Sequence, residues 1–365
     1  MKKVAFSYAF IGLLFLVGSC NNAPTVETPA AEYSLKGNLL KVDKANLGMI
    51  PELSLKNNIV ISRKFDYYGS ILTEKEWFKT DTLFLLGNGH NEFQFLSFAK
   101  GQNNSLLLLD RPWIGNKLLS LTCVSNTESI TSMKDKSKWD KYDLSNLPPF
   151  NFSTSGFVSL TDSTILVPGA PYDTINHIFS IINYKNQHVY TLDYWPDDDS
   201  KCADMPKHSV YTNNSTLIGN DKGRYLYQCF NQKFAFIFTI DGRKIDIIKQ
   251  LYSEYPQYTQ DESKLNPQYF STTEYMSSHA NSQNIYLLFK DSDSKGQKIE
   301  KWVNPYFFGN TIEVYDWEGN KEKIIHLDKF GDWFYVSEDN KTLYLESEDA
   351  DGKRLFWTYN LTETN

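Results

Sequence analysis

A short polar turn followed by an apolar run recurs along the chain at a nearly constant spacing. The apolar runs begin at residues 106, 165, 225, 285 and 343, so successive copies lie 59, 60, 60 and 58 residues apart. A sixth copy, with Ile59–Ile61 as its apolar run, lies 47 residues upstream. Most of these turns contain Asn, Asp or Gly, which tolerate left-handed backbone or hydrogen-bond their own main chain. A fixed period among strand-like segments predicts a repeat architecture.

The segments within one period predict a four-stranded antiparallel sheet. Aromatic residues make up 15% of the chain, which favours strands, and no long segment has helical periodicity. We therefore predict an all-β fold, a six-bladed β-propeller of four-stranded antiparallel blades. The last blade is one strand short, and a spare strand-like stretch at 33–42 precedes the first blade. We expect this N-terminal strand to close the last blade, because closure leaves no open edge in the ring.

The N-terminus carries a targeting signal. Lys2 and Lys3 precede an apolar stretch at 4–17 that is too short for a comfortable membrane span, and the sequence Leu-Val-Gly-Ser-Cys ends at Cys20. This resembles the bacterial lipobox, in which the cysteine is acylated, and an ordinary secretory signal with a chance cysteine is the alternative. By resemblance to lipoprotein sorting rules, Asn21 favours the outer membrane, with its periplasmic or surface face left open. The expected domains are a signal peptide (1–19), a lipidated tether (20–32) and the propeller (33–365).

The charge and the cysteine content limit which partners the protein is expected to bind and which disulfides it is expected to form. The formal net charge of −7 argues against a nucleic-acid partner, which would need a basic face. We expect a monomer held to the membrane by its N-terminal lipid. Apart from Cys20, the cysteines are Cys123, Cys202 and Cys229, an odd number that gives no complete disulfide framework. A disulfide between Cys202 and Cys229 is left as an alternative.

Three segments indicate a family. Thr239–Arg243 and the segment 314–320 resemble the "I-x-V-Y-D-x-x-G" hairpins of six-bladed propeller lipoproteins, and the segment 86–93 resembles their glycine-rich "G-x-G-x-x-E-F" turn. The mature chain is similar to the TolB-like six-bladed propeller family of the bacterial cell envelope over about 50–361. The resemblance implies this fold and location, and it brings no catalytic residues.

The long connections predict where a binding site lies. In an up-and-down blade the first-to-second turns share one end of the ring, and all the long connections (110–116, 168–176, 194–208, 253–267 and 290–310) fall at the other. Binding residues concentrate in loops on a rigid scaffold, although unselected drift of surface loops is the alternative. Aromatic and Arg side chains are typical interface anchors. The candidate ligand-binding residues are His90, Asn91, Glu92, Arg111, Trp113, Tyr172, Asp173, Trp195, Trp302 and Tyr306, with Tyr255 and Tyr258 on the same face.

The motifs do not indicate catalysis. Asp197–Asp199 with Asp204 is the densest carboxylate group, and we interpret it as a solvated loop rather than a Ca²⁺ site. The six histidines have no zinc-site spacing, and no G-x-S-x-G occurs. We therefore expect no metal and no cofactor, and the catalytic residues stay unknown. A non-enzymatic binding or scaffold protein for a protein, peptide or glycan is favoured. An envelope hydrolase or lyase with a metal in the propeller channel is the alternative.

Overall fold

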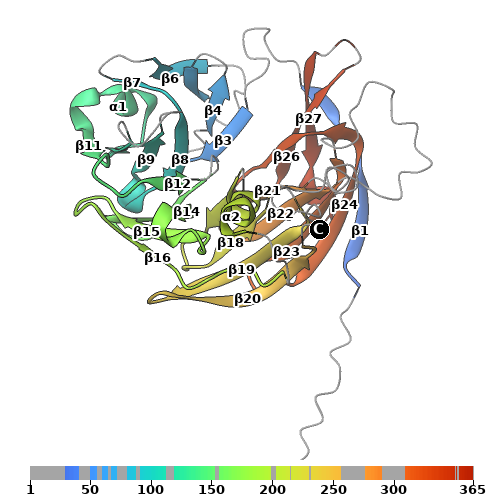
Figure 1. The fold of residues 1–365 in the computed structure, drawn as a ribbon. Coiled ribbons are helices and arrows are strands. Elements are labelled where there is room, and N and C mark those ends of the chain that lie inside the picture. The colour runs from blue at the N-terminus through green and yellow to red at the C-terminus, as the bar shows by residue number, and fades with distance from the viewer. Residues whose placement is uncertain are drawn as a thin grey trace, which may run out of the picture.

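The computed structural model describes residues 29–40, 50–55, 60–64, 67–71, 80–87, 91–111, 119–152, 156–198, 203–213, 215–229, 232–255, 276–289, 309–349, 351 and 353–364. Strands dominate these residues and form a β-propeller arrangement, which confirms the predicted all-β class. Figure 1 shows the sheets surrounding a common centre.

Among the described residues, the strands form six hydrogen-bonded sheets, and we call the five that lie between β8 and β27 the regular sheets. In chain order, the strands of these five sheets are β8 (Leu96–Lys100), β9 (Leu106–Asp110), β10 (Ser120–Val124) and β11 (Trp139–Asp143); β12 (Phe150–Phe152), β13 (Val158–Ser159), β14 (Thr164–Pro171), β15 (Phe179–Asn183) and β16 (His188–Thr191); β17 (Thr216–Gly219), β18 (Tyr225–Gln228), β19 (Phe234–Asp241) and β20 (Lys244–Ser253); β21 (Met276–Ala280), β22 (Asn284–Phe289), β23 (Gly309–Asp316) and β24 (Lys321–Gly331); and β25 (Trp333–Val336), β26 (Thr342–Glu348) and β27 (Arg354–Asn360).

The remaining sheet departs from this plan. It contains β3 (Ile50–Ser54), β4 (Val60–Lys64), β5 (Tyr67–Ile71), β6 (Thr80–Leu86) and β7 (Glu92–Phe93), and β7 runs parallel to β6. The arrangement counts as a propeller of five blades, so the predicted number of six is corrected. Strands β3–β6 are consecutive and antiparallel, as in the other sheets, and β7 is added to them as a parallel edge strand.

The polar turns lie where the repeat predicts them. The second strands of the five regular sheets begin at Leu106, Thr164, Tyr225, Asn284 and Thr342, each within one residue of the predicted onset. Left-handed backbone occurs at Asn103 and Asn104 (φ 55° and 60°), at Gly223 (72°) and at Asn340 (58°). These positions confirm that Asn and Gly occupy the turns because they adopt this conformation at low cost.

The N-terminal segment joins two sheets instead of one. β2 (Asn38–Leu40) pairs antiparallel with β27, which confirms that an N-terminal strand closes the last sheet. β1 (Ala31–Leu35), which the sequence did not predict, pairs parallel with β24 of the preceding sheet. The segment therefore covers the outer edges of two neighbouring sheets, and Figure 1 shows β1 along the outside of the ring.

The core lies between neighbouring sheets, and β19 shows how. Phe234, Phe236 and Phe238 belong to the buried cluster shared with β14 and β15. The alternate residues Ala235 and Ile237 belong to the cluster shared with β22. Both faces of residues 234–238 are buried, so this part of the strand is apolar on both faces, as predicted.

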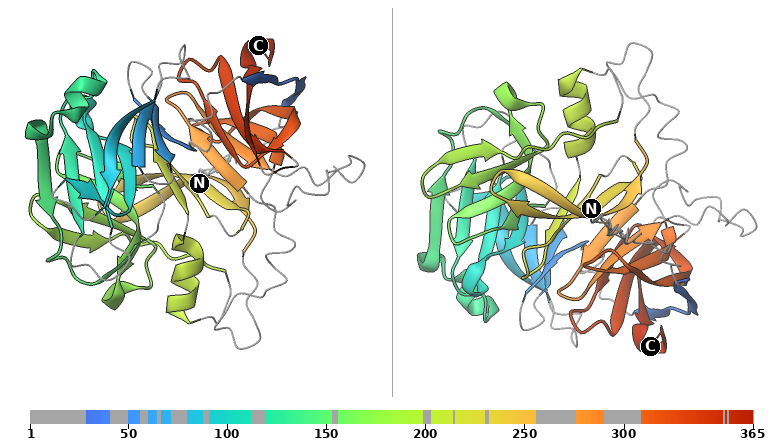
Figure 2. Two further views of the ribbon diagram at one scale, coloured as in Figure 1. Left: turned by 90° about the horizontal axis from the view of Figure 1, so that it is seen from above. Right: turned by 90° about the horizontal axis from the view of Figure 1, so that it is seen from below.

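Two short α-helices occur in the described part of the chain: α1 (Ile130–Lys134) and α2 (Asp204–Thr212). In Figure 2, α2 projects from one face of the ring. No helix within the described residues has the length and apolar character needed to cross a membrane. Cys229 is buried and Cys123 half-buried, both as free thiols, and Cys202 lies outside the described residues.

Candidate functional site

The two ends of the ring differ, and we name each by the residues found there. The turn face carries the short turns with Asn103, Gly223 and Asn340. The loop face, at the opposite end, carries Arg111 and α2, because the second and fourth strands of each regular sheet end there.

Only part of the predicted site falls within the described residues. The structure describes Asn91, Glu92, Arg111, Tyr172, Asp173 and Trp195. Outside the described residues lie the lipidation residue Cys20, the candidates His90, Trp113, Trp302 and Tyr306, and the further candidate Tyr258.

The Arg111 side chain is buried and serves the packing of the loop face. Its Nη2 donates to Ser97 Oγ at 2.7 Å, and its guanidinium lies 5.8 Å from the centre of the Phe95 ring. The neighbouring Asp110 accepts the backbone amides of Gln94 and Phe95 at 2.9 and 2.8 Å. Burial raises the pKa of Asp110 despite these bonds. Arg111 is thus a structural residue here and is not the exposed anchor that the sequence suggested.

Asn91 and Glu92 lie at the edge of the same region. Asn91 Oδ1 accepts a hydrogen bond from Lys141 Nζ at 3.0 Å. Glu92 is exposed and lies against Gly87, where a Cβ would come within 2.1 Å of its Oε2. The Gly87 amide donates to the Phe93 carbonyl at 2.9 Å. The glycine of this motif therefore permits a close approach of two chain segments.

α2 is fixed by a buried ion pair to the segment that connects it to β16. Lys207 Nζ lies 2.6 Å from Asp198 Oδ1, both side chains are almost fully removed from solvent, and Tyr211 Oη donates to Asp198 Oδ2 at 2.9 Å. Lys207 also donates to the Pro196 carbonyl at 2.6 Å and lies 5.0 Å from the centre of the Trp195 ring. The interpretation of the acidic segment as solvated is therefore wrong for Asp198, although Asp197 is exposed.

A buried histidine fixes the other side of α2. Asn151 Nδ2 on β12 lies 3.0 Å from His208 Nδ1, and Thr212 Oγ1 lies 3.3 Å from the same atom. Burial lowers the pKa of His208 to about 4, with an opposing contribution from a backbone hydrogen bond with His177. The ring is therefore neutral near pH 7, and Nδ1 accepts the Asn151 amide.

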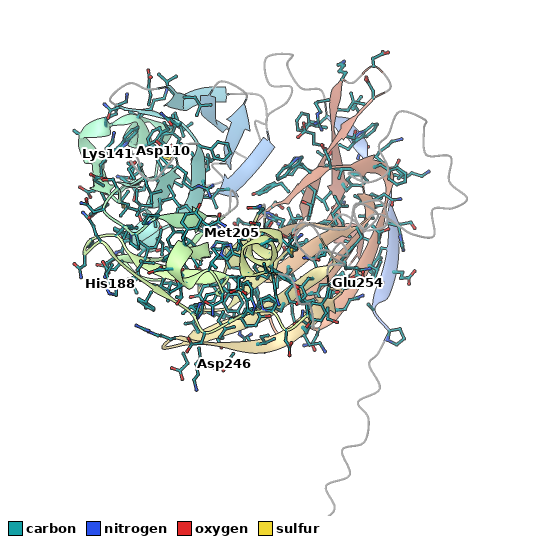
Figure 3. All side chains as sticks on the ribbon, in the orientation of Figure 1. Asp110, Lys141, His188, Met205, Asp246 and Glu254 are labelled. Carbon is teal, nitrogen blue, oxygen red and sulfur yellow. The ribbon has the colours of Figure 1, made fainter. Side chains whose placement is uncertain are left out.

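Three exposed apolar side chains lie on the loop face, one of them on this helix. Tyr172 is 52% exposed, Met205 41% and Tyr255 41%, values well above those of a core residue. Met205 Sδ lies 3.9 Å from Asn151 Nδ2, and the Tyr255 ring lies 5.5 Å from that of Phe234. Figure 3 places Met205 on α2, near the middle of this face. We call Tyr172, Met205 and Tyr255 the α2 surface.

The α2 surface is partly what the sequence predicted. Tyr172 and Asp173 are exposed on the loop face as expected, whereas Trp195 is half-buried against Lys207. Met205 was missed because an isolated methionine beside a proline carries no sequence signal of exposure.

The inner strands bring a second polar group together at the turn face. Lys100 Nζ lies 2.8 Å from Glu338 Oε1, and His279 Nε2 lies 3.1 Å from the Val336 carbonyl. Burial, followed by the charge of Lys100, lowers the pKa of His279 to about 4. Within the described part of the chain, no three His, Cys, Asp or Glu residues lie close enough to hold a metal ion.

The comparisons with known proteins concern the fold. No protein-family model matches the chain, and no curated protein sequence matches it. A protein described as exported, from Bacteroides fragilis, aligns at 10% identity over 91% of this chain and 99% of its own, with a TM-score of 0.55. A member of the DUF4221 family from Bacteroides vulgatus aligns at 11% identity over 89% and 97%, with a TM-score of 0.51. Likeness at this identity shows a shared fold and no shared activity.

A more distant likeness is to an enzyme. An oligogalacturonate lyase in complex with manganese aligns at 11% identity over 86% of this chain and 76% of its own, with a TM-score of only 0.39. This value carries no argument about the activity of the present chain.

Proposed function

We propose that the chain is an envelope lipoprotein that binds a protein, peptide or glycan through the α2 surface and performs no catalysis of its own. The observation that carries the proposal is the exposure of Tyr172, Met205 and Tyr255 on the face of the ring that carries α2. Tyr and Met side chains supply large contact areas, and exposed apolar groups that gather on one face are typical of interaction sites.

The rigidity of α2 supports this role. A binding surface that is ordered before the partner arrives loses less conformational entropy on association. The buried Lys207–Asp198 pair and the contact between His208 and Asn151 hold α2 from two sides. A buried pair of this kind gains little net stability, so its contribution is to fix position.

The membrane anchor belongs to the same proposal. We propose acylation of Cys20 and attachment to the outer membrane, with the protein acting as a monomer. The direction of β1 supports an orientation in which the α2 surface lies away from the membrane anchor. It runs parallel to β24, which begins at the turn face, so the described chain enters the ring at Ala31 on that face. The α2 surface then lies at the end of the ring opposite the point of attachment.

We further propose that the chain is related to the TolB-like propellers. Support for the kinship comes from the hairpins that carry its motifs, with left-handed glycines at Gly242 (φ 60°) and Gly319 (φ 82°).

The binding function is tested by comparing two sets of serine variants. Tyr172, Met205 and Tyr255 are changed to Ser in one protein, and the equally exposed Leu85 and Ile247, which lie on strands, are changed in the control. Both proteins are used to capture partners from envelope extracts and from glycan arrays. We expect binding at least about tenfold weaker for the first set and unchanged for the control. Equal capture by both sets would contradict the proposal.

A further inference from the structure

A small cavity lies on the turn face, away from the α2 surface. It has a volume of about 290 Å³ and lies between the sheet β21–β24 and the sheet β25–β27. Its apolar lining consists of Val314, Ile325 and Leu361. The short turns that precede β22 and β26 complete the wall, so the cavity is built from the repeated unit of the fold.

Side-chain amides line this cavity and hold one another in place. Asn340 Nδ2 donates to Asn284 Oδ1 at 3.2 Å, and Asn340 Oδ1 accepts from Tyr286 Oη at 2.7 Å. Asn284 Nδ2 in turn donates to Glu322 Oε2 at 2.8 Å. Gln283 Oε1 accepts a further bond from Asn340. This network fixes the amide and carboxylate groups before any ligand binds, which lowers the entropic cost of binding.

The charges around the cavity balance. Glu322 and Asp339 are matched by Lys323 and Lys341, and Lys341 Nζ lies 3.2 Å from Asp339 Oδ2. A strongly charged ligand would therefore gain little net attraction here. Asn340 and Asn284 use both protons of their amide nitrogens within the wall, so the capacity left for a ligand lies on the Gln283 amide nitrogen and on the Glu322 and Asp339 carboxylates. Such groups suit a ligand whose polar atoms both donate and accept.

We propose that this cavity binds one neutral sugar unit, either free or at the end of a glycan chain. Sugar hydroxyls both donate and accept hydrogen bonds, which matches the amide wall. The C–H face of the ring then packs on Val314, Ile325 and Leu361. The volume is at the lower end of ligand pockets, which limits the ligand to about one sugar ring. This site is independent of the α2 surface.

The test uses the full-length chain, isotope-labelled so that side-chain amide signals are resolved. Neutral hexoses and N-acetylhexosamines are titrated to about 50 mM, well above a weak millimolar Kd. We expect the amide signals of Asn284 and Asn340 to shift with at least one sugar. Immobilised glycans that end in the same sugar are tested in parallel with the free sugar. Binding to these glycans without binding to the free sugar would show that the site recognises the end of a glycan chain.

Two variants make the test specific. Thr362 lines the cavity and is exposed, so Thr362→Trp fills the opening, while Gln283→Leu removes one amide without adding bulk. Each is expected to weaken sugar binding at least about tenfold. Lys222→Trp, at an exposed position in the turn before β18, is the control and leaves binding unchanged. The proposal is overturned if no sugar shifts the amides, if both variants bind as the parent does, or if a uronic acid binds better than its neutral counterpart.

Discussion

The backbone amide of Gly37 donates a hydrogen bond to Asp328 Oδ1 at 2.9 Å, across 291 positions of the chain. Tyr359 Oη donates to the same oxygen at 3.2 Å. Three parts of the chain meet at this carboxylate: the link between β1 and β2, the strand β24 and the strand β27. Gly37 suits the crossing because a Cβ there would lie 2.8 Å from Tyr359 Cζ. The N-terminal segment is therefore an integral part of the ring.

Asp328→Ala is expected to destabilise the whole protein. The change removes the acceptor of the Gly37 amide and of the Tyr359 hydroxyl, and because the site is partly open to water the expected loss is roughly 1 kcal/mol. Urea denaturation followed by intrinsic fluorescence measures the free energy of unfolding. Asp351→Ala, at an exposed position, is the control and should leave it unchanged. An Asp328→Ala protein as stable as the parent would show that the crossing contributes nothing to closure.

Lys207→Met is expected to release α2. The variant leaves the Asp198 carboxylate buried without its cation, and breaking a buried pair on one side costs about 3–5 kcal/mol. Asp198→Asn combined with Lys207→Met removes both charges and should recover part of the loss. Hydrogen exchange of the α2 amides separates local release from global unfolding. Unchanged protection of α2 in Lys207→Met would be inconsistent with the pair holding the helix.

Stability is expected to fall in mild acid. The pKa of His208 is lowered to about 4 in the folded chain, against 6.5 for the free side chain. The unfolded chain therefore takes up the proton first as the pH drops. The contribution of His208 is complete above about pH 6.5 and is lost progressively toward pH 4, by up to about 3 kcal/mol. His279, with a pKa also near 4, acts in the same direction.

A His208→Asn variant checks the pH effect. Asn offers an oxygen acceptor to Asn151 and does not titrate, so the melting temperature should depend less steeply on pH between 6.5 and 4. Part of the slope remains because His279 is unchanged. A slope identical to that of the parent would remove His208 as a cause of the acid sensitivity.

Cys20→Ala tests the proposed anchor. The variant lacks the thiol that would be acylated, and two or more acyl chains are needed for stable membrane attachment. We expect the protein to move from the membrane pellet to the soluble fraction of fractionated cells, with the parent chain as the reference. Complete retention in the membrane pellet would mean that another feature holds the protein there.

Much of the fold could be predicted because its determinants are local. Asn103, Gly223 and Asn340 take left-handed backbone in turns, and each is followed by an apolar strand, so the repeat is visible in the sequence. The pairing of β1 with β24 could not be predicted, because nothing in Ala31–Leu35 specifies which distant edge it joins. The predicted number of six blades was wrong, because the spacing of turns along the chain does not specify how the strands assemble in space.

The candidate site was predicted less well than the fold. α2 lacks a strong helical pattern, and Pro206 in its first turn suggests a loop, although proline is compatible with that position. The helix depends on tertiary contacts of Lys207 and His208, which sequence spacing does not reveal. Arg111 was misjudged because an arginine after a strand is equally suited to a buried contact with Ser97.

Site-specific photo-cross-linking tests the binding role of the α2 surface most directly. A photoreactive amino acid replaces Met205 in one protein and Lys222, exposed on the turn face, in another, and intact cells are irradiated. We predict a discrete cross-linked product from position 205 that is absent from position 222 and disappears when Tyr172 and Tyr255 are changed to Ser. Products that are the same from both positions, or that persist in the serine variant, would contradict binding at α2.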